Sequence, residues 1–363
     1  MGHTTGTCAA AATKAAALSL ITKKNVNSVQ IHTPKGIILD LPVEDLSFDE
    51  KEAKCAVRKD GGDDIDVTHN TLVYSNVTLT DSGIDIDGGF GVGIVTRKGL
   101  DQPVGNAAIN RVPRAMIKEV LEDIMFTYGY NGGFKVVISV PAGIDLADKT
   151  FNPRLGIEGG ISILGTSGIV EPMSEIALIN TIKTEMDMRT ANGWDTILVV
   201  PGNYGKEFTE SLPGIDPESA VKCSNFVGEM LDHACSLKKD VLLIGNLGKM
   251  VKLAGGIMNT HSRNADCRME ILASNFIMVG GDLETAKEIM NCISTDDALD
   301  LINKADLLKE ESKLLIDKIE YHVNHRTGGN INTGVIVFSS VYGLLGMTSK
   351  AEELLEKVRR QGS

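Results

Sequence analysis

Three apolar runs in the second half of the chain decide its fold: Thr196-Ile-Leu-Val-Val200, Asp240-Val-Leu-Leu-Ile-Gly245 and Thr333-Gly-Val-Ile-Val-Phe338. A fourth run, Gly160-Ile-Ser-Ile-Leu-Gly165, precedes them. Helical patterns separate the runs, and a strand that is apolar along its whole length is typical of burial on both faces. The sequence therefore predicts a three-layer α/β domain over residues 159–363, with helices on both faces of a mostly parallel sheet.

Residues 1–158 show a different hydrophobic periodicity. Alternating short segments at 29–32, 36–41, 53–59, 76–80, 91–97 and 135–140 predict strands between turns, with one helix at about 112–125. An alanine-rich stretch at 4–20 predicts another helix, whose small side chains suit either close packing or a flat ligand. We therefore expect a mixed-sheet α+β domain, with the boundary near residue 158.

The composition excludes several classes of function. With 36 Lys and Arg against 48 Asp and Glu, the net charge of −12 argues against a nucleic-acid partner. The 6 cysteines lack CxxC or zinc-like spacing, which predicts reduced thiols and no metal site. We see neither a leader pattern nor an apolar run of membrane-spanning length, so we expect a cytoplasmic protein without a membrane partner. A homo-oligomer is compatible with the sequence.

Three of the apolar runs lead into glycine-rich loops. In an open parallel sheet, ligands bind beyond the carboxyl ends of the strands, and glycine lets the backbone approach a ligand closely. Three such loops in register could hold a nucleoside and a carboxylate; the alternative is that glycine merely ends each strand. The spacing of a dinucleotide-binding loop is missing. The candidate binding residues are Gly165, Thr166, Ser167, Gly168, Pro201, Gly202, Asn203, Tyr204, Gly245, Asn246 and Gly248.

Polar clusters elsewhere offer further candidates. The loop at 59–69 contains Asp60, Asp63, Asp64 and His69, and reads either as a solvated turn or as a site for proton transfer. Arginines suit the recognition of carboxylates because the guanidinium pairs with them bidentately. The basic and polar candidates for ligand contact are Arg111, Arg114, Arg154, Asn259 and His261.

Long blocks of the chain resemble one known family. The blocks are HTTGTCAAAATKAA (3–16), KDGGDDIDVTH (59–69), GVGIVTRKGL (91–100), PVGNAAINRVPRAMI (103–117), FNPRLGIEGGISILGTSGIVEPMS (151–174), PGNYG (201–205), SNFVGEMLD (224–232) and KMVKLAGGIMNTHS (249–262). Taken in this order, they resemble the cobalt-precorrin-5B (C1)-methyltransferase family of the anaerobic cobalamin pathway.

The resemblance implies methyl transfer from S-adenosylmethionine to C-1 of cobalt-precorrin-5B, giving cobalt-precorrin-6A. It implies a cobalt-containing tetrapyrrole as partner, whose metal arrives with the substrate. We expect the methyl donor at the three glycine loops and the macrocycle against the first domain. The expected ring contacts are Thr4, Thr5, Asp60, Asp63, Arg111, Arg114, Arg154, Asn259 and His261, with Asp64 or His69 as a proton acceptor.

Two rival functions are weighed against this one. A nicotinamide-dependent oxidoreductase of the same pathway would need an acidic ribose anchor after the second strand, where the chain has Asn203. A corrinoid carrier would bind the macrocycle without affinity for S-adenosylmethionine. Neither rival accounts for the motif blocks.

Overall fold

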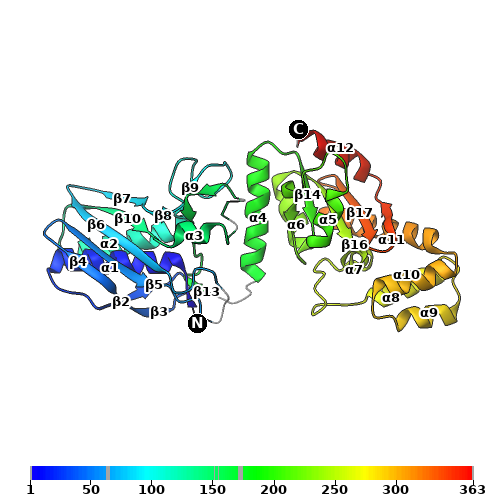
Figure 1. The fold of residues 1–363 in the computed structure, drawn as a ribbon, viewed down its shortest axis with the longest axis horizontal. Coiled ribbons are helices and arrows are strands. Elements are labelled where there is room, and N and C mark those ends of the chain that lie inside the picture. Colours follow the sequence, from blue (N-terminus) through cyan, green and yellow to red (C-terminus); the bar gives the residue numbers. More distant parts are fainter. Residues whose placement is uncertain (1, 63–65, 151, 154, 171–174, 362–363) are drawn as a thin grey trace. The chain divides into compact units, whose positions relative to one another are not determined.

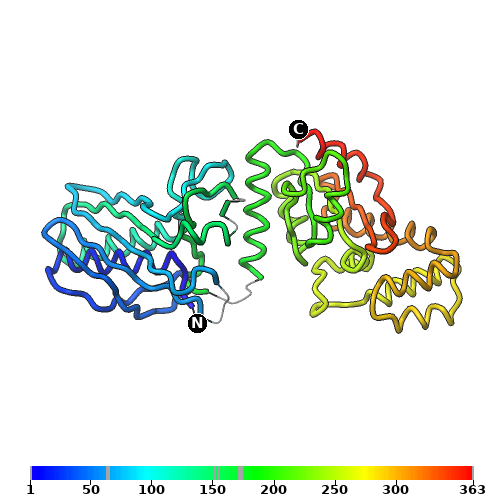
Figure 2. The backbone as a smooth tube through the Cα atoms, in the orientation of Figure 1, coloured from blue at the N-terminus to red at the C-terminus, as the bar shows by residue number. Residues whose placement is uncertain are grey.

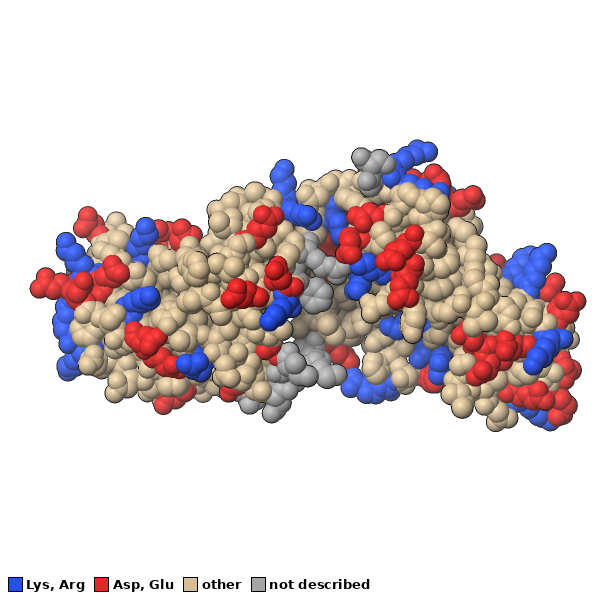
Figure 3. All heavy atoms as spheres, in the orientation of Figure 1, with Lys and Arg blue, Asp and Glu red and all other residues tan. Residues whose placement is uncertain are grey.

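The computed structural model describes residues 2–62, 66–150, 152–153, 155–170 and 175–361 of the chain. The chain divides into two compact units, Met1–Ser174 and Glu175–Ser363. Figures 1 and 2 trace the two units from blue to red along the sequence. On the face drawn in Figure 3, acidic and basic side chains are interspersed. No helix in the described ranges has the length and apolar character that a bilayer span requires.

The first unit is an α+β fold. Its elements are β1 (Gly2–His3), α1 (Thr5–Thr22), β2 (Ser28–His32), β3 (Ile38–Pro42), β4 (Glu44–Phe48), β5 (Glu52–Arg58), β6 (Leu72–Thr80), β7 (Ile84–Gly88), β8 (Gly91–Val92), β9 (Ile94–Val95), α2 (Arg111–Tyr128), β10 (Gly133–Ser139), α3 (Gly143–Ala147), β11 (Ile157–Glu158), β12 (Gly160–Ile161) and β13 (Ile169–Val170). The main sheet has the order β4-β5-β6-β10-β7, and only the β10–β7 pair is parallel. This confirms the predicted mixed sheet.

The alanine-rich helix α1 is buried on every side. Ala9–Ala12 and Ala15–Ala17 are all 0% exposed, between the sheet, α2 and the β2–β3 hairpin. Small side chains let the neighbouring backbones approach closely, and Thr13 reaches Ser75 of β6 through a 2.8 Å hydroxyl contact. The close-packing interpretation of this helix is confirmed, because its surface is covered by the protein itself.

The second unit is a three-layer α/β fold. Its elements are α4 (Glu175–Ala191), β14 (Thr196–Val200), α5 (Asn203–Glu210), η1 (Pro217–Ser219), β15 (Val221–Lys222), α6 (Val227–Leu237), β16 (Asp240–Asn246), α7 (Leu247–Met250), η2 (Val251–Gly255), α8 (Arg268–Met278), α9 (Leu283–Met290), α10 (Thr295–Lys304), α11 (Leu308–Thr327), β17 (Thr333–Ser339), β18 (Gly343–Met347) and α12 (Ala351–Gln361). The sheet order is β15-β14-β16-β17-β18, parallel except for the edge strand β18.

Both faces of this sheet are covered, as the apolar runs predict. On one face, Ile197, Val199 and Leu243 pack in a core with α6 and α11. On the other face, Leu198 and Ile244 belong to a core that includes α12. The strand side chains alternate between the two cores, so that each strand is buried on both sides.

Three expectations differ from the structure. The run at 160–165 is not a strand of the parallel sheet, because β12 pairs with β8 and β13 pairs with β1 inside the first unit. The division therefore falls after residue 174 and not near 158. The helical pattern expected between the runs 196–200 and 240–245 is interrupted by the two-residue strand β15, which extends the sheet beside β14.

The turn at Gly91 generates a prediction about stability. Its φ is +77°, and a Cβ there would lie 1.8 Å from the carbonyl oxygen of Val140, whereas Gly36 has φ +82° and open space around it. In both Gly36→Ala and Gly91→Ala, the positive φ costs about 1 kcal/mol of folding free energy. Only Gly91→Ala also pushes two backbone segments apart, which costs about 2 kcal/mol or more in addition. Urea unfolding should show Gly91→Ala as much the less stable variant; equal losses would contradict the close approach.

The buried Glu311 generates a prediction about pH. This side chain in α11 is 1% exposed, and burial raises its pKa to about 8, against the smaller lowering effects of Lys318 and of the Asn275 side chain. Between about pH 4.5 and pH 8 the folded state keeps a proton that the unfolded chain loses, so the free energy of unfolding falls as the pH rises.

Replacing this carboxyl by an amide removes that dependence. We expect Glu311→Gln to match the wild type near pH 4.5 and to exceed its free energy of unfolding by roughly 3 kcal/mol at pH 7. Urea titrations at several pH values measure the difference. Identical pH slopes for the two proteins would show that Glu311 is ionised in the folded state.

Candidate functional site

Two glycine-rich loops lie side by side at one edge of the parallel sheet. β14 and β16 are paired, with Thr196 opposite Asp240 at one end and Val199 opposite Leu243 at the other. Each strand leads through its loop into a helix, β14 into α5 and β16 into α7. At Gly205 a Cβ would lie 2.9 Å from the carbonyl oxygen of Ile244, so α5 packs closely against the end of β16. The expected neighbourhood of the loops 201–205 and 245–249 is confirmed.

The third predicted loop is not at this edge. Gly165, Thr166, Ser167 and Gly168 belong to the first unit, where the backbone carbonyl of Gly168 accepts a 2.7 Å hydrogen bond from the Thr7 hydroxyl. A Cβ at Gly165 would lie 2.1 Å from the hydroxyl of Thr4. The expectation of three loops in register is therefore wrong, because these glycines let their segment pack against the start of α1.

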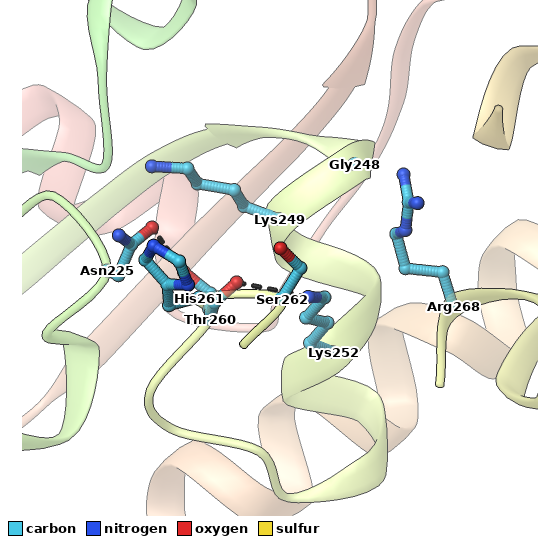
Figure 4. Close-up of a pocket in the computed structure, with 8 residues that line it drawn as sticks. All are labelled: Asn225, Gly248, Lys249, Lys252, Thr260, His261, Ser262 and Arg268. Carbon is cyan, nitrogen blue, oxygen red and sulfur yellow. Dashed lines mark hydrogen bonds between the residues drawn. The ribbon is translucent and has the colours of Figure 1, made fainter. Parts of the chain in front are cut away.

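A pocket of about 300 Å³ opens beside the end of β16 (Figure 4), and we call it the strand-end pocket. It is lined by Asn225, Gly248, Lys249, Lys252, Thr260, His261, Ser262 and Arg268. The segment after η2 returns to this edge because Phe226 and Asn259 form a β-bridge and the Thr260 amide donates to the Asn225 carbonyl at 2.9 Å. Parts of the chain that follow β15, β16 and η2 thus meet at one place.

Lys249 links these loops. Its ammonium donates hydrogen bonds to the carbonyl oxygens of Pro201 at 3.0 Å and Ser224 at 3.3 Å. Pro201 follows β14, Ser224 follows β15, and Lys249 lies on α7 after β16. Burial lowers the pKa of Lys249, which indicates a poorly hydrated amine.

The other two cations of the pocket share one carboxylate. Arg268 donates to both oxygens of Asp266, at 2.5 and 3.0 Å, and these hydrogen bonds lower the pKa of Asp266. Lys252 is 2% exposed; it donates to the carbonyl oxygens of Thr260 and Ala265, and its ammonium lies 3.6 Å from the Asp266 carboxylate. These two side chains fix the segment 260–268 against η2.

His261, one of the predicted ligand contacts, lines the strand-end pocket. His261 Nδ1 accepts a 3.0 Å hydrogen bond from the Arg263 amide, so the neutral ring carries its proton on Nε2. The Asn259 side chain accepts from the His261 amide at 3.1 Å and orders the turn. The two predicted residues therefore differ, since His261 lines the pocket and Asn259 supports it.

A second hollow, of about 490 Å³, lies on the first unit, and we call it the hairpin pocket. It is lined by His32, Thr33, Pro34, Arg111, Val112, Ala115, Met116 and Glu119. These residues come from the end of β2, the turn after it and the first turns of α2. Met116 and Val112 give an apolar floor, while Arg111 and His32 are exposed.

Several residues predicted to contact a ring instead support the first unit. Thr4 and Thr5 are 7% and 4% exposed; Thr4 caps α1 and Thr5 exchanges hydrogen bonds with the backbone of Leu164. Arg114 donates to the carbonyl oxygens of Ile109 at 2.9 Å and Ile86 at 2.7 Å, and burial lowers its pKa. Their hydrogen bonds are internal, and of the two predicted arginines of α2, only Arg111 lines a pocket.

The loop at 59–69 is described in part. Asp63, Asp64 and Arg154 lie outside the described residues. The Gly62 amide donates to the Asp60 carboxylate at 2.8 Å and lowers its pKa, and the Gly61 amide donates to His69 Nδ1 at 3.0 Å. Within the described parts of the chain, no three His, Cys, Asp or Glu side chains gather as a metal site.

Sequence reasoning missed the cations of the strand-end pocket and most of the residues that line the hairpin pocket. Lys249 is the last residue of the second glycine loop, 245–249, and a lysine at that position was the available signal. Lys252 and Arg268 carried no such signal, because their places depend on a turn between η2 and α8. The residues missed are Asn225, Lys249, Lys252, Thr260, Ser262, Arg268, His32, Thr33, Pro34, Val112, Ala115, Met116 and Glu119.

Comparison with known proteins covers nearly the whole chain. A family model described as CbiD matches residues 1–172, and one described as CbiD, C-terminal domain, matches residues 259–349. A protein of Ruminiclostridium cellulolyticum named cobalt-precorrin-5B C(1)-methyltransferase is 46% identical over 94% of this chain and 89% of its own. Proteins of the same name from Alkaliphilus metalliredigens and Listeria monocytogenes are 44% and 40% identical, over 99% of this chain and 95% and 96% of theirs. A crystal structure of the cobalamin biosynthesis protein CbiD from Archaeoglobus fulgidus is 30% identical, with 73% of this chain and 82% of that chain covered and a TM-score of 0.40.

Proposed function

Because the chain belongs to the CbiD family of cobalt-precorrin-5B C(1)-methyltransferases, we propose that S-adenosylmethionine is its methyl donor and that each of its two units holds one ligand. The reaction is the transfer of a methyl group to C-1 of cobalt-precorrin-5B in cobalamin biosynthesis. The donor belongs at the strand-end pocket and the loops beside it, and the tetrapyrrole belongs at the hairpin pocket.

One observation carries the donor assignment: two glycine-rich loops and a polar pocket meet at the carboxyl edge of a parallel sheet. This is where open α/β sheets bind nucleoside ligands. A Cβ at Gly202 would meet only the ammonium of Lys249, at 3.9 Å, which leaves room beside the first loop. Asn203 and Tyr204 are exposed there, so amide and aromatic groups are available to a nucleoside.

The hairpin pocket suits an edge of the tetrapyrrole. Its floor is apolar, which fits the face of a macrocycle, and Arg111 and His32 can pair with the acetate and propionate groups at the ring periphery. The Arg111 guanidinium carries the charge, while its backbone amide donates to the carboxylate of Asp101. The net charge of −12 makes such local cations necessary for an anionic substrate.

The chemistry asks little of the protein beyond alignment. A sulfonium carries a methyl group that is already activated, so catalysis requires that sulfur, methyl carbon and ring carbon be held in line, and no protein nucleophile is needed. The residues at the loop 201–205 and the strand-end pocket would orient the donor. Those of the hairpin pocket would fix the ring, whose cobalt is part of the substrate.

Transfer of labelled methyl tests the function directly. We expect anaerobic incubation with S-adenosylmethionine carrying a ¹³C-methyl group and cobalt-precorrin-5B to place the label at C-1 of the ring, as read by NMR. Label at another ring position would contradict the proposal. A protein that binds the ring and transfers no label would be a carrier instead.

Two substitutions test the division of the ligands. Arg111→Ala should raise the KM for the tetrapyrrole about 10-fold and leave the KM for the donor unchanged, because one charged hydrogen bond is lost. Asn203→Ala should raise the KM for the donor alone. Lys118→Ala is the control, since this exposed lysine of α2 pairs with Glu122 and lines neither pocket. Effects on the opposite ligands would refute the assignment.

A further inference from the structure

The strand-end pocket holds more positive than negative charge. Three cations line it, Lys249, Lys252 and Arg268, and Asp266 is the carboxylate paired with two of them. On a protein with a net charge of −12, this is a local excess of two positive charges. A buried cation is costly unless an anion or several dipoles compensate it.

Lys249 is the cation without a carboxylate. Its partners among the described residues are two backbone carbonyls, from Pro201 and Ser224, and no ion pair to it is found there. The neighbouring thiol of Cys223 cannot supply the missing charge, because burial raises its pKa to about 12 and keeps it neutral. The charge of Lys249 is therefore balanced by dipoles alone.

The geometry leaves one donor of Lys249 for a ligand. An ammonium has three N–H groups, and two of them reach the carbonyl oxygens at 3.0 and 3.3 Å. In Figure 4, the lysine side chain extends along the pocket above Asn225 and His261. Since His261 Nδ1 accepts from Arg263, its Nε2–H is a second donor for the same ligand.

We infer that the strand-end pocket is a carboxylate site, and that Lys249 binds the α-carboxylate of the methyl donor. The inference rests on the proposed function, because S-adenosylmethionine brings one carboxylate and no phosphate. Lys249 thereby acts as a positioning residue: it joins the three strand-end loops and fixes the amino-acid end of the donor. The nucleoside end extends toward the loop 201–205, whose Gly202 adjoins the same ammonium.

The test compares two ligands that differ only in the carboxylate. Calorimetry would measure the Kd of S-adenosylhomocysteine and of its decarboxylated analogue, 5′-(3-aminopropylthio)-5′-deoxyadenosine. We expect the wild-type chain to prefer S-adenosylhomocysteine by about 10- to 100-fold, the factor of one charged hydrogen bond. In Lys249→Met that preference should fall to a few-fold at most, because the ligand with the carboxylate loses its ammonium partner and keeps only the His261 donor.

Two further variants separate this role from folding. Lys249→Arg keeps the charge and should keep part of the preference. Lys287→Met removes an exposed lysine that pairs with Glu284 on α9, and should leave both Kd values unchanged while altering the net charge equally.

The outcomes are distinct. An equal loss for both ligands in Lys249→Met would mean that Lys249 only holds the loops, and a preference that persists would place the carboxylate elsewhere; either result overturns the inference. If the wild-type chain binds neither nucleoside, the donor assignment under the proposed function fails as well.

Discussion

A half-buried ammonium group, that of Lys249, holds the edge of the second unit together. Three parallel strands end there, and the register of β14 with its neighbours stops at Val199 and Val200. Beyond that point, Lys249 joins the loops by donating to the carbonyl oxygens of Pro201 and Ser224. The same contacts hold a positive charge in poorly hydrated surroundings, so the group that stabilises the loops also creates an anion-binding site.

In the first unit, too, polar side chains hold loops and strand ends by hydrogen bonds to backbone groups. Its arginine Arg114 is used for two backbone carbonyls, and the threonines at the start of α1 bond to the segment 164–168. Polar side chains that the sequence suggests as ligand contacts thus form hydrogen bonds within the protein instead. The exposed Arg111, three residues before Arg114 on α2, lines the hairpin pocket.

The parts of the fold set by local pattern could be predicted from the sequence. β14, β16 and β17 follow from apolar runs because burial on both faces requires such runs. The run at 160–165 has a similar apolar composition but lies in the first unit, since its partner β8 is distant in sequence and pairing over that distance leaves no local signal. The two-residue β15 is too short to show a period at all.

The position of the candidate site in the second unit could be predicted from the sequence, but the side chains that line it could not. The glycine loops after β14 and β16 were recognisable, because the position of a ligand in an open sheet follows from its topology. The side chains that give the pocket its charge were not, because Arg268 and Lys252 meet only through Asp266 and a turn that returns from η2. Whether an arginine or lysine faces a ligand or its own backbone is decided by tertiary packing.

The pairing of β1 with β13 has a consequence for synthesis on the ribosome. Gly2 and His3 pair with Val170 and Ile169, and Thr7 bonds to Gly168, so this segment finds these partners only after about 160 further residues have emerged. Contacts between distant residues form slowly because a long chain segment must close first. Strand β1 therefore lacks this pairing until residues 169–170 have left the exit tunnel, whereas the neighbours of α1 in β5, β6 and α2 emerge earlier.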